Sequence, residues 1–209
     1  MEKLVEITVD EKNMKVTPNI TVLQMLREHS IYVPALCYYP HLEATGSCGL
    51  CMVEILKDDK WETRHACLLK VNDGMQIRTT SPRLSMLRSW AAKILLRYKP
   101  FLNKETEKML LNLVQDETKE DENLTKCIKE LYSSMTEGCI LCGLCVRMCS
   151  QIGKHNLTYL GRGKNLRIGF VTGEDDKAPC GNCQACQHVC PNGFINTNAE
   201  QAFTAKLYR

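Results

Sequence analysis

The chain has 209 residues, which is enough for one large domain or for two to three small ones. Its 27 basic and 24 acidic residues leave a net charge of only +3, and aromatic residues make up 6%, so neither the concentrated basic face nor the stacking platform of a nucleic-acid-binding protein is expected. No run of 18 apolar residues occurs, so we expect no membrane span.

The beginning of the chain, MEKLVEITVD, lacks the basic and then apolar order of a signal peptide. We therefore expect a cytoplasmic protein, in which thiols stay reduced. The 13 cysteines are then poor candidates for disulfides and better candidates for metal ligands.

The first 81 residues alternate between strand and helix patterns. Apolar and polar residues alternate over 3–9 and continue over 14–18 after a turn, which predicts two strands. A helix follows from Thr21, with Asn19 or Thr21 as its cap, and then a long loop over 34–51. Further strands are predicted at 52–56, 63–69 and 75–79. This order indicates an α+β domain over residues 1–81.

Residues 82–135 have the pattern of a helical linker. Leu84, Leu87, Ala91, Ile94 and Leu95 repeat at helical spacing, with Met86 and Trp90 broadening the apolar stripe and Pro100 ending the helix. A second helix is predicted around 106–114 and a third around 124–132, with a charged connector between them. We interpret this segment as a spacer and docking surface.

Residues 136–209 are dominated by glycine and cysteine, and we expect short helices and turns there. Two copies of the Cys-x2-Cys-x2-Cys-x3-Cys run of bacterial ferredoxins occur, and the second is followed by Pro191. In this pattern three thiolates surround one cluster and the fourth reaches the other. One [4Fe–4S] cluster is therefore predicted on Cys139, Cys142, Cys145 and Cys190, and a second on Cys180, Cys183, Cys186 and Cys149.

Glycine and apolar residues accompany these runs. Gly143 and Gly181 would allow the backbone to approach inorganic sulfide closely. Shielding of the clusters is predicted for Ile140, Val146, Val189 and Phe194. Zinc is the alternative metal, but zinc ribbons use two separate cysteine pairs, which an unbroken run of four fits poorly.

The amino-terminal set consists of Cys37, Cys48, Cys51 and Cys67, the last of them expected on a strand. Plant-type [2Fe–2S] ferredoxins use shorter first spacings, but a loop with small residues and a preceding strand–strand–helix order favour a β-grasp [2Fe–2S] domain. A four-cysteine zinc site on a β scaffold is the alternative.

Three features are not assigned to a cluster. Cys127 lies on the apolar stripe of the third predicted helix and is interpreted as a buried hydrophobic residue. The five histidines show no partner pattern. Gly161 and Gly163 resemble the start of a dinucleotide fingerprint without its third glycine, and a turn is the better interpretation.

These motifs resemble the iron–sulfur amino-terminal half of the complex I large subunit, and equally the same region of [FeFe]-hydrogenases and of the small diaphorase subunit of NAD-reducing hydrogenases. The resemblance rests on CYYPHLEATGSCGLC with RHAC, and on CILCGLCVRMC, GRG, RIG and CGNCQACQHVCPNG. One motif of the family is missing. Its members usually carry a cluster motif of one histidine and three cysteines between the two domains, and the corresponding segment here, LLRYKPFLN, lacks these ligands. The resemblance therefore implies three clusters.

The sequence contains no recognisable flavin, nicotinamide or molybdopterin fold, so substrate chemistry is expected in another subunit. We expect an electron-transfer subunit of a multisubunit cytoplasmic oxidoreductase, in a hetero-oligomer with a flavin-containing NAD(P)H dehydrogenase subunit and a catalytic subunit. The catalytic subunit would be a hydrogenase, a formate dehydrogenase, a molybdenum or tungsten enzyme, or a bifurcating complex. The alternatives are a free polyferredoxin carrier and a zinc-dependent nucleic-acid-binding module. The carboxyl-terminal AFTAKLYR is a candidate docking segment.

Overall fold

The computed structural model describes residues 4–114, 137–171 and 183–195. Contacts divide these residues into two units, one formed by 4–40, 44–92 and 113–114, and the other by 41–43, 93–112, 137–171 and 183–195. Within these ranges no helix has the length and apolar character needed to cross a membrane. The third predicted helix, Cys127 and the carboxyl-terminal segment lie outside the described residues.

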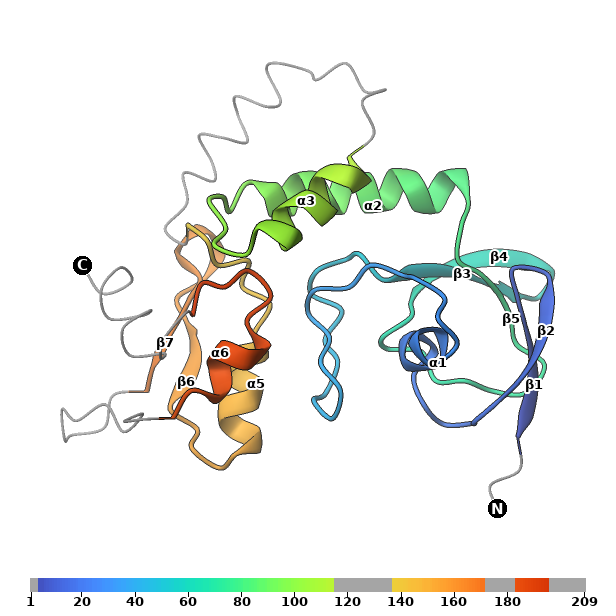
Figure 1. Ribbon diagram of the computed structural model, residues 1–209, viewed down its shortest axis with the longest axis horizontal. Helices are drawn as coiled ribbons and strands as arrows, with labels where there is room; N and C mark the ends of the chain where they lie inside the picture. Colours follow the sequence, from blue (N-terminus) through green and yellow to red (C-terminus); the bar gives the residue numbers. More distant parts are fainter. Residues whose placement is uncertain (1–3, 115–136, 172–182, 196–209) are drawn as a thin grey trace. The chain divides into compact units, whose positions relative to one another are not determined.

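The first unit is a five-stranded mixed sheet with a helix against it (Figure 1). The strands are β1 (Val5–Val9), β2 (Lys12–Val16), β3 (Met52–Lys57), β4 (Lys60–His65) and β5 (Gln76–Arg78), in the order β2-β1-β5-β3-β4. β1 and β5 pair in parallel, and the other pairs are antiparallel. Helix α1 (Val22–Glu28) contributes Leu23 and Leu26 to a core shared with Ile7, Val53 and Ile77. This β-grasp arrangement confirms the predicted α+β class.

Local sequence explains the boundaries of these elements. Thr21 is the amino-terminal cap of α1, because its side chain accepts a hydrogen bond from the Gln24 amide at 3.1 Å. Asp58 and Asp59 both have positive φ and form a two-residue turn, with Lys57 paired to Lys60. The strand predicted over 63–69 is therefore placed too late. It runs from Lys60 to His65, and Cys67 lies in the turn that follows rather than on a strand.

Two helices begin the segment after the sheet, α2 (Pro82–Leu96) and α3 (Lys104–Leu113). The apolar stripe predicted for α2 is only partly correct. Leu84, Ala92 and Leu95 are buried, whereas the stripe residues Met86, Trp90 and Ile94 are 49%, 42% and 51% exposed. The buried side instead includes a charged residue, Arg88. Because Leu84, Arg88 and Ala92 are spaced four apart, they share one face of the helix.

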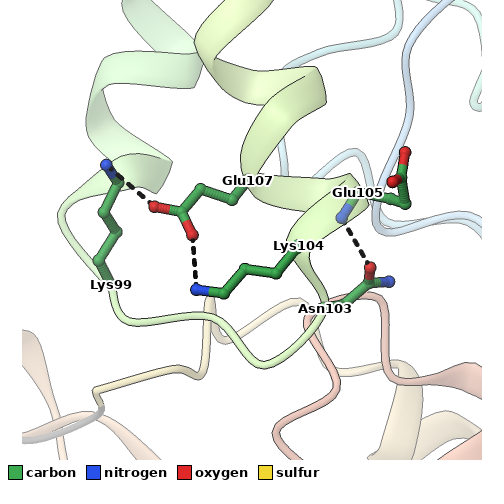
Figure 2. A network of polar contacts seen from close by, with 5 residues as sticks. All are labelled: Lys99, Asn103, Lys104, Glu105 and Glu107. Carbon is green, nitrogen blue, oxygen red and sulfur yellow. Dashed lines mark hydrogen bonds and ion pairs between the residues drawn. The ribbon is translucent and has the colours of Figure 1, made fainter.

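The turn between α2 and α3 is held by polar contacts (Figure 2). The side-chain oxygen of Asn103 accepts a hydrogen bond from the Glu105 amide at 3.1 Å, and so caps α3. Glu107 forms ion pairs with Lys104 at 3.1 Å and Lys99 at 3.2 Å, which lower the pKa of its carboxyl group. These contacts connect α3 to the turn that precedes it.

The second unit also contains two short helices and a hairpin. Helix α5 (Leu144–Gln151) precedes strands β6 (Leu157–Leu160) and β7 (Arg167–Phe170), and helix α6 (Ala185–Val189) follows. The hairpin is not among the predicted elements. Gly161 and the 3-10 turn Gly163–Asn165 lie at its tip, which confirms the interpretation of this glycine pair as a turn. A Cβ on Gly161 would lie 2.3 Å from the carbonyl oxygen of Asn165, so the turn requires glycine.

Candidate metal centres

The structure brings the four amino-terminal cysteines together from loops around the sheet. Cys37 and Cys48 lie in the loop between α1 and β3, Cys51 directly precedes β3, and Cys67 lies in the turn after β4. All four are at most 4% exposed. Their burial places the thiols away from water, in a loop packed on the β-grasp core.

The four thiols form two close pairs. The sulfurs of Cys37 and Cys48 are 3.4 Å apart, and those of Cys51 and Cys67 are 3.3 Å apart. Two cysteine sulfurs on one tetrahedral metal ion with bonds of about 2.3 Å are about 3.8 Å apart. Each pair is thus close to the spacing needed for one metal ion. Two such pairs fit a two-metal centre, whereas one zinc ion would bring all four sulfurs to that separation.

Hydrogen bonds within each pair prepare one thiol for ionisation. The Cys37 thiol donates to Cys48, which lowers the pKa of Cys48 to about 5 and raises the pKa of Cys37. In the second pair the bond from Cys51 lowers the pKa of Cys67 and raises the pKa of Cys51. Thiolates are the form that binds metals, so each pair offers a ready ligand.

Backbone conformation shapes the loop around these thiols. Gly46 and Gly49 have φ values of 68° and 67°, in the left-handed region that favours glycine. A Cβ on Gly46 would come within 3.1 Å of the Leu68 side chain. The amide of Cys48 points at the Cys37 sulfur, with a nitrogen-to-sulfur distance of 3.4 Å. The small residues in ATGSCGLC therefore allow the backbone to fold closely onto the thiol cluster.

In the second unit four further cysteines line one cavity. Its walls include Cys139, Cys142, Cys145 and Cys190, which are the residues predicted to hold the first [4Fe–4S] cluster. Cys190 comes from the second cysteine run, just after α6, and the other three come from the first run. The remaining lining is largely apolar and includes Leu144, Ile168 and Ile195, together with Ile140 and Phe194, two of the residues predicted to shield a cluster. Four thiols in an apolar cavity fit a buried iron–sulfur cluster.

Burial dominates the electrostatics of this cavity. It raises the pKa of Cys139 to about 12 and the pKa of Cys145 well above its ordinary value, with the neighbouring thiols as a secondary cause. Two thiolates without a metal would be costly here, because buried charges need a partner. The site is therefore better suited to a cationic cluster core than to free thiols.

Gly143 opens α5 in the left-handed conformation, with φ of 70°. A Cβ at this position would lie 1.9 Å from the hydroxyl oxygen of Tyr159. That hydroxyl donates to the carbonyl oxygen of Leu141 at 3.4 Å, and burial raises the pKa of Tyr159 to about 12. Gly143 is needed here to admit Tyr159, which covers the loop between Cys142 and Cys145. Gly181, the other predicted glycine, lies outside the described residues.

The predicted ligands of the second [4Fe–4S] cluster are described in part. Cys149 and Cys186 are 4% and 5% exposed and belong to one apolar cluster with Leu157 and Ile168. The Asn156 amide donates to the Cys149 sulfur at 3.2 Å. Cys183 is partly buried, and Cys180 lies outside the described residues. The structure thus brings Cys149 and Cys186 into one core but does not test the complete set.

The α2–α3 turn contacts the segment that carries Cys190. The Asn103 amide donates to the Asn192 carbonyl at 3.0 Å, and the Asn103 side chain donates to the Pro191 carbonyl at 2.9 Å. The hydroxyl of Thr106 donates to the same Pro191 carbonyl at 2.5 Å. Sequence reasoning missed these positioning residues, because neither Asn103 nor Thr106 belongs to a cysteine motif.

Comparison with known proteins identifies both cluster regions. Residues 2–82 match the 2Fe-2S iron-sulfur cluster binding domain, and residues 138–194 match the 4Fe-4S dicluster domain. The eight carboxyl-terminal cysteines fit two [4Fe–4S] clusters. The chain is thus a protein with a [2Fe–2S] domain and a [4Fe–4S] dicluster domain.

Similar proteins belong to large oxidoreductases. The chain is 28% identical over 208 residues to an NADH-quinone oxidoreductase subunit of Rhizobium meliloti, covering 92% of the chain and 24% of that protein. It is 28% identical over 206 residues to the NADPH-Fe(3+) oxidoreductase subunit alpha of Geobacter sulfurreducens, with the same coverage of 92% and 24%. The chain therefore spans about a quarter of the length of these relatives.

A solved structure shares the fold. A chain of an NAD+-reducing [NiFe]-hydrogenase in its H2-reduced state aligns with a TM-score of 0.59 at 23% identity, covering 81% of this chain and 76% of that one. The resemblance to complex I and to NAD-reducing hydrogenase is confirmed by these comparisons. The chain is an iron–sulfur electron-transfer region related to the NADH-quinone and NADPH-Fe(3+) oxidoreductase subunits.

Proposed function

We propose that this chain is a non-catalytic electron-transfer subunit that carries one [2Fe–2S] and two [4Fe–4S] clusters. The observation that carries the proposal is the cavity in which Cys190 joins Cys139, Cys142 and Cys145. The two close thiol pairs of the amino-terminal loop support it independently. When bound, such clusters accept and release one electron at a time.

The proposed ligands follow from the cysteine positions. The [2Fe–2S] centre would be held by Cys37 and Cys48 on one iron and by Cys51 and Cys67 on the other, as the thiol pairs indicate. The first [4Fe–4S] cluster would use the cavity cysteines. The second would use Cys180, Cys183, Cys186 and Cys149. The corresponding division is a [2Fe–2S] domain over 1–81, a helical linker over 82–135 and a dicluster domain over 136–209.

We propose a cytoplasmic hetero-oligomer in which this chain relays electrons between a flavin-containing NAD(P)H dehydrogenase subunit and a catalytic oxidoreductase subunit. Its relatives, which include subunits of an NADH-quinone and an NADPH-Fe(3+) oxidoreductase, support this assignment. So does the structural relation to a chain of an NAD+-reducing hydrogenase. The nearly balanced charge favours a fixed subunit over a diffusing carrier, because soluble carriers commonly use strong net charge to find partners.

The experiment is anaerobic size-exclusion chromatography of an extract from the source cells, with the chain detected by antibody. A subunit is expected to elute in a larger complex that contains flavin, and its iron–sulfur absorbance is expected to bleach on addition of NADH or NADPH. Elution of all the material as a free chain of 23.8 kDa would contradict the subunit assignment and favour the free carrier.

A further inference from the structure

A buried arginine bonds the residue that follows Cys51 in the chain. Arg88 is 8% exposed, although it lies on α2, a helix with exposed residues on its other side. One of its terminal nitrogens donates to the carbonyl oxygen of Met52 at 2.6 Å and to that of Thr79 at 2.9 Å. Its Nε has no hydrogen-bond partner among the described residues. Burial of a charged guanidinium group is unfavourable unless another interaction compensates for it.

The position of Arg88 supplies that interaction. Met52, which receives the hydrogen bond, directly follows Cys51, and Cys51 is completely buried. Burial lowers the pKa of Arg88, and Cys51 is the first of the groups that raise it again, before Tyr32 and Asp10. Arginine remains protonated in proteins under such conditions. Arg88 is therefore a permanent positive charge beside a cysteine of the thiol cluster.

Carboxylates do not neutralise this charge directly. None of the ion pairs found among residues 4–114, 137–171 and 183–195 includes Arg88. Asp10, the acidic group with an influence on it, is engaged by Thr79, whose amide and hydroxyl donate to it at 2.7 and 2.5 Å. Two anionic features therefore lie near the acceptors of the guanidinium: Asp10 beside Thr79, and the cysteine cluster beside Met52.

A cluster with four thiolate ligands is already anionic, and its reduction adds a further negative charge. A nearby cation in a poorly screened interior stabilises the reduced form more than the oxidised form. We infer that Arg88 is a buried counter-charge that raises the reduction potential of the [2Fe–2S] centre. This role rests on the proposed function, since it requires that Cys37, Cys48, Cys51 and Cys67 hold that centre.

A purely structural role makes a different prediction. The hydrogen bonds to Met52 and Thr79 also attach α2 to β3 and to the end of β5. If Arg88 only held the helix, its replacement would lower stability and leave the potential of the assembled centre unchanged. Charge and attachment can be separated, because lysine keeps the charge and glutamine keeps a donor without the charge.

The experiment is a redox titration of the full-length, anaerobically purified chain, with the [2Fe–2S] centre followed by its EPR signal. At a solution potential where the wild-type centre is half reduced, Arg88→Met and Arg88→Gln are expected to show about a tenfold lower ratio of reduced to oxidised centre. This corresponds to a midpoint about 59 mV lower for a one-electron centre. Arg88→Lys, which can carry a positive charge, is expected to titrate closer to the wild type than either neutral variant.

Arg83→Met is the matched control, because Arg83 is an exposed arginine on the same helix. It is expected to change the ratio by less than about twofold, since exposed charges are screened. The proposal is overturned if the neutral variants assemble the centre and titrate like the wild type. It is also overturned if both neutral variants lose the centre while Arg88→Lys retains it, because the charge would then be needed for assembly. Absence of a [2Fe–2S] signal from the wild type would instead refute the proposed function.

Discussion

The α2–α3 turn contacts Pro191 and Asn192, which we call the Cys190 segment. These contacts predict that two polar side chains, distant in sequence from any cysteine motif, control the stability of the first [4Fe–4S] site. Thr106→Val removes the 2.5 Å hydrogen bond to Pro191 and keeps the side-chain shape. Asn103→Ala removes the 2.9 Å bond to the same carbonyl and also the cap of α3. Both variants leave every proposed ligand in place.

The expected magnitudes follow from the bonds removed. One hydrogen bond contributes about 1 kcal/mol and a helix cap a further ~1 kcal/mol. Opening of the Cys190 segment should therefore become about fivefold more frequent in Thr106→Val and about 30-fold more frequent in Asn103→Ala. Because both side chains bond one carbonyl oxygen, the double variant leaves that oxygen without either donor. Its effect should exceed the product of the two single effects.

The assay is the rate at which an iron chelator removes iron from the [4Fe–4S] clusters, which follows the population of locally open molecules. The [2Fe–2S] signal of the same sample is the internal reference, and Lys104→Met is the control. Lys104 is an exposed member of an ion pair on the same turn, so its loss should change the rate by less than about twofold. Wild-type rates in Thr106→Val and Asn103→Ala would refute this reasoning, as would equal acceleration of [2Fe–2S] loss.

Further substitutions test other parts of the account. Gly143→Ala should lower cluster content and melting temperature more than Gly153→Ala. Both glycines have positive φ, but only at Gly143 would the new Cβ lie 1.9 Å from the Tyr159 hydroxyl oxygen. Equal effects of the two substitutions would exclude the steric explanation. Glu11→Gly should stabilise the first unit by about 0.5–1 kcal/mol, because Glu11 has φ of 68° in a two-residue turn. An unchanged midpoint of thermal unfolding would argue against backbone strain at this position. Cys67→Ser should abolish the [2Fe–2S] EPR signal and leave the [4Fe–4S] signals, whereas persistence of a normal [2Fe–2S] spectrum would remove Cys67 from the ligand set.

Much of the cluster chemistry could be predicted from the sequence, because metal ligation depends on residue type and spacing. The cysteine run from Cys139 predicts a fourth ligand from the other run, and the structure places Cys190 in one cavity with Cys139, Cys142 and Cys145. The β-grasp order was also predictable, since alternating strands and a capped helix leave local signals. The prediction of a strand over 63–69 leaves 57–62 as a connector, which is too long, because Asp58 and Asp59 suffice for the turn.

The parts that sequence reasoning missed depend on contacts between distant segments. The buried side of α2 contains Arg88. A pattern of apolar residues does not include this position, because arginine is charged. Its backbone partners, Met52 and Thr79, carry no sequence signal at all. The spacing of Arg88 from Leu84 and Ala92 was the available signal, since an arginine on a buried helix face needs a partner. Likewise, Asn103 and Thr106 gain their role only through Pro191.

The most direct test of the central claim is the metal content and EPR spectrum of the anaerobically purified, dithionite-reduced chain. The account predicts about 10 iron atoms per chain, one slowly relaxing [2Fe–2S] signal and the signals of a magnetically coupled [4Fe–4S] pair. A colourless protein with stoichiometric zinc and no iron would contradict it and restore the zinc-binding alternative.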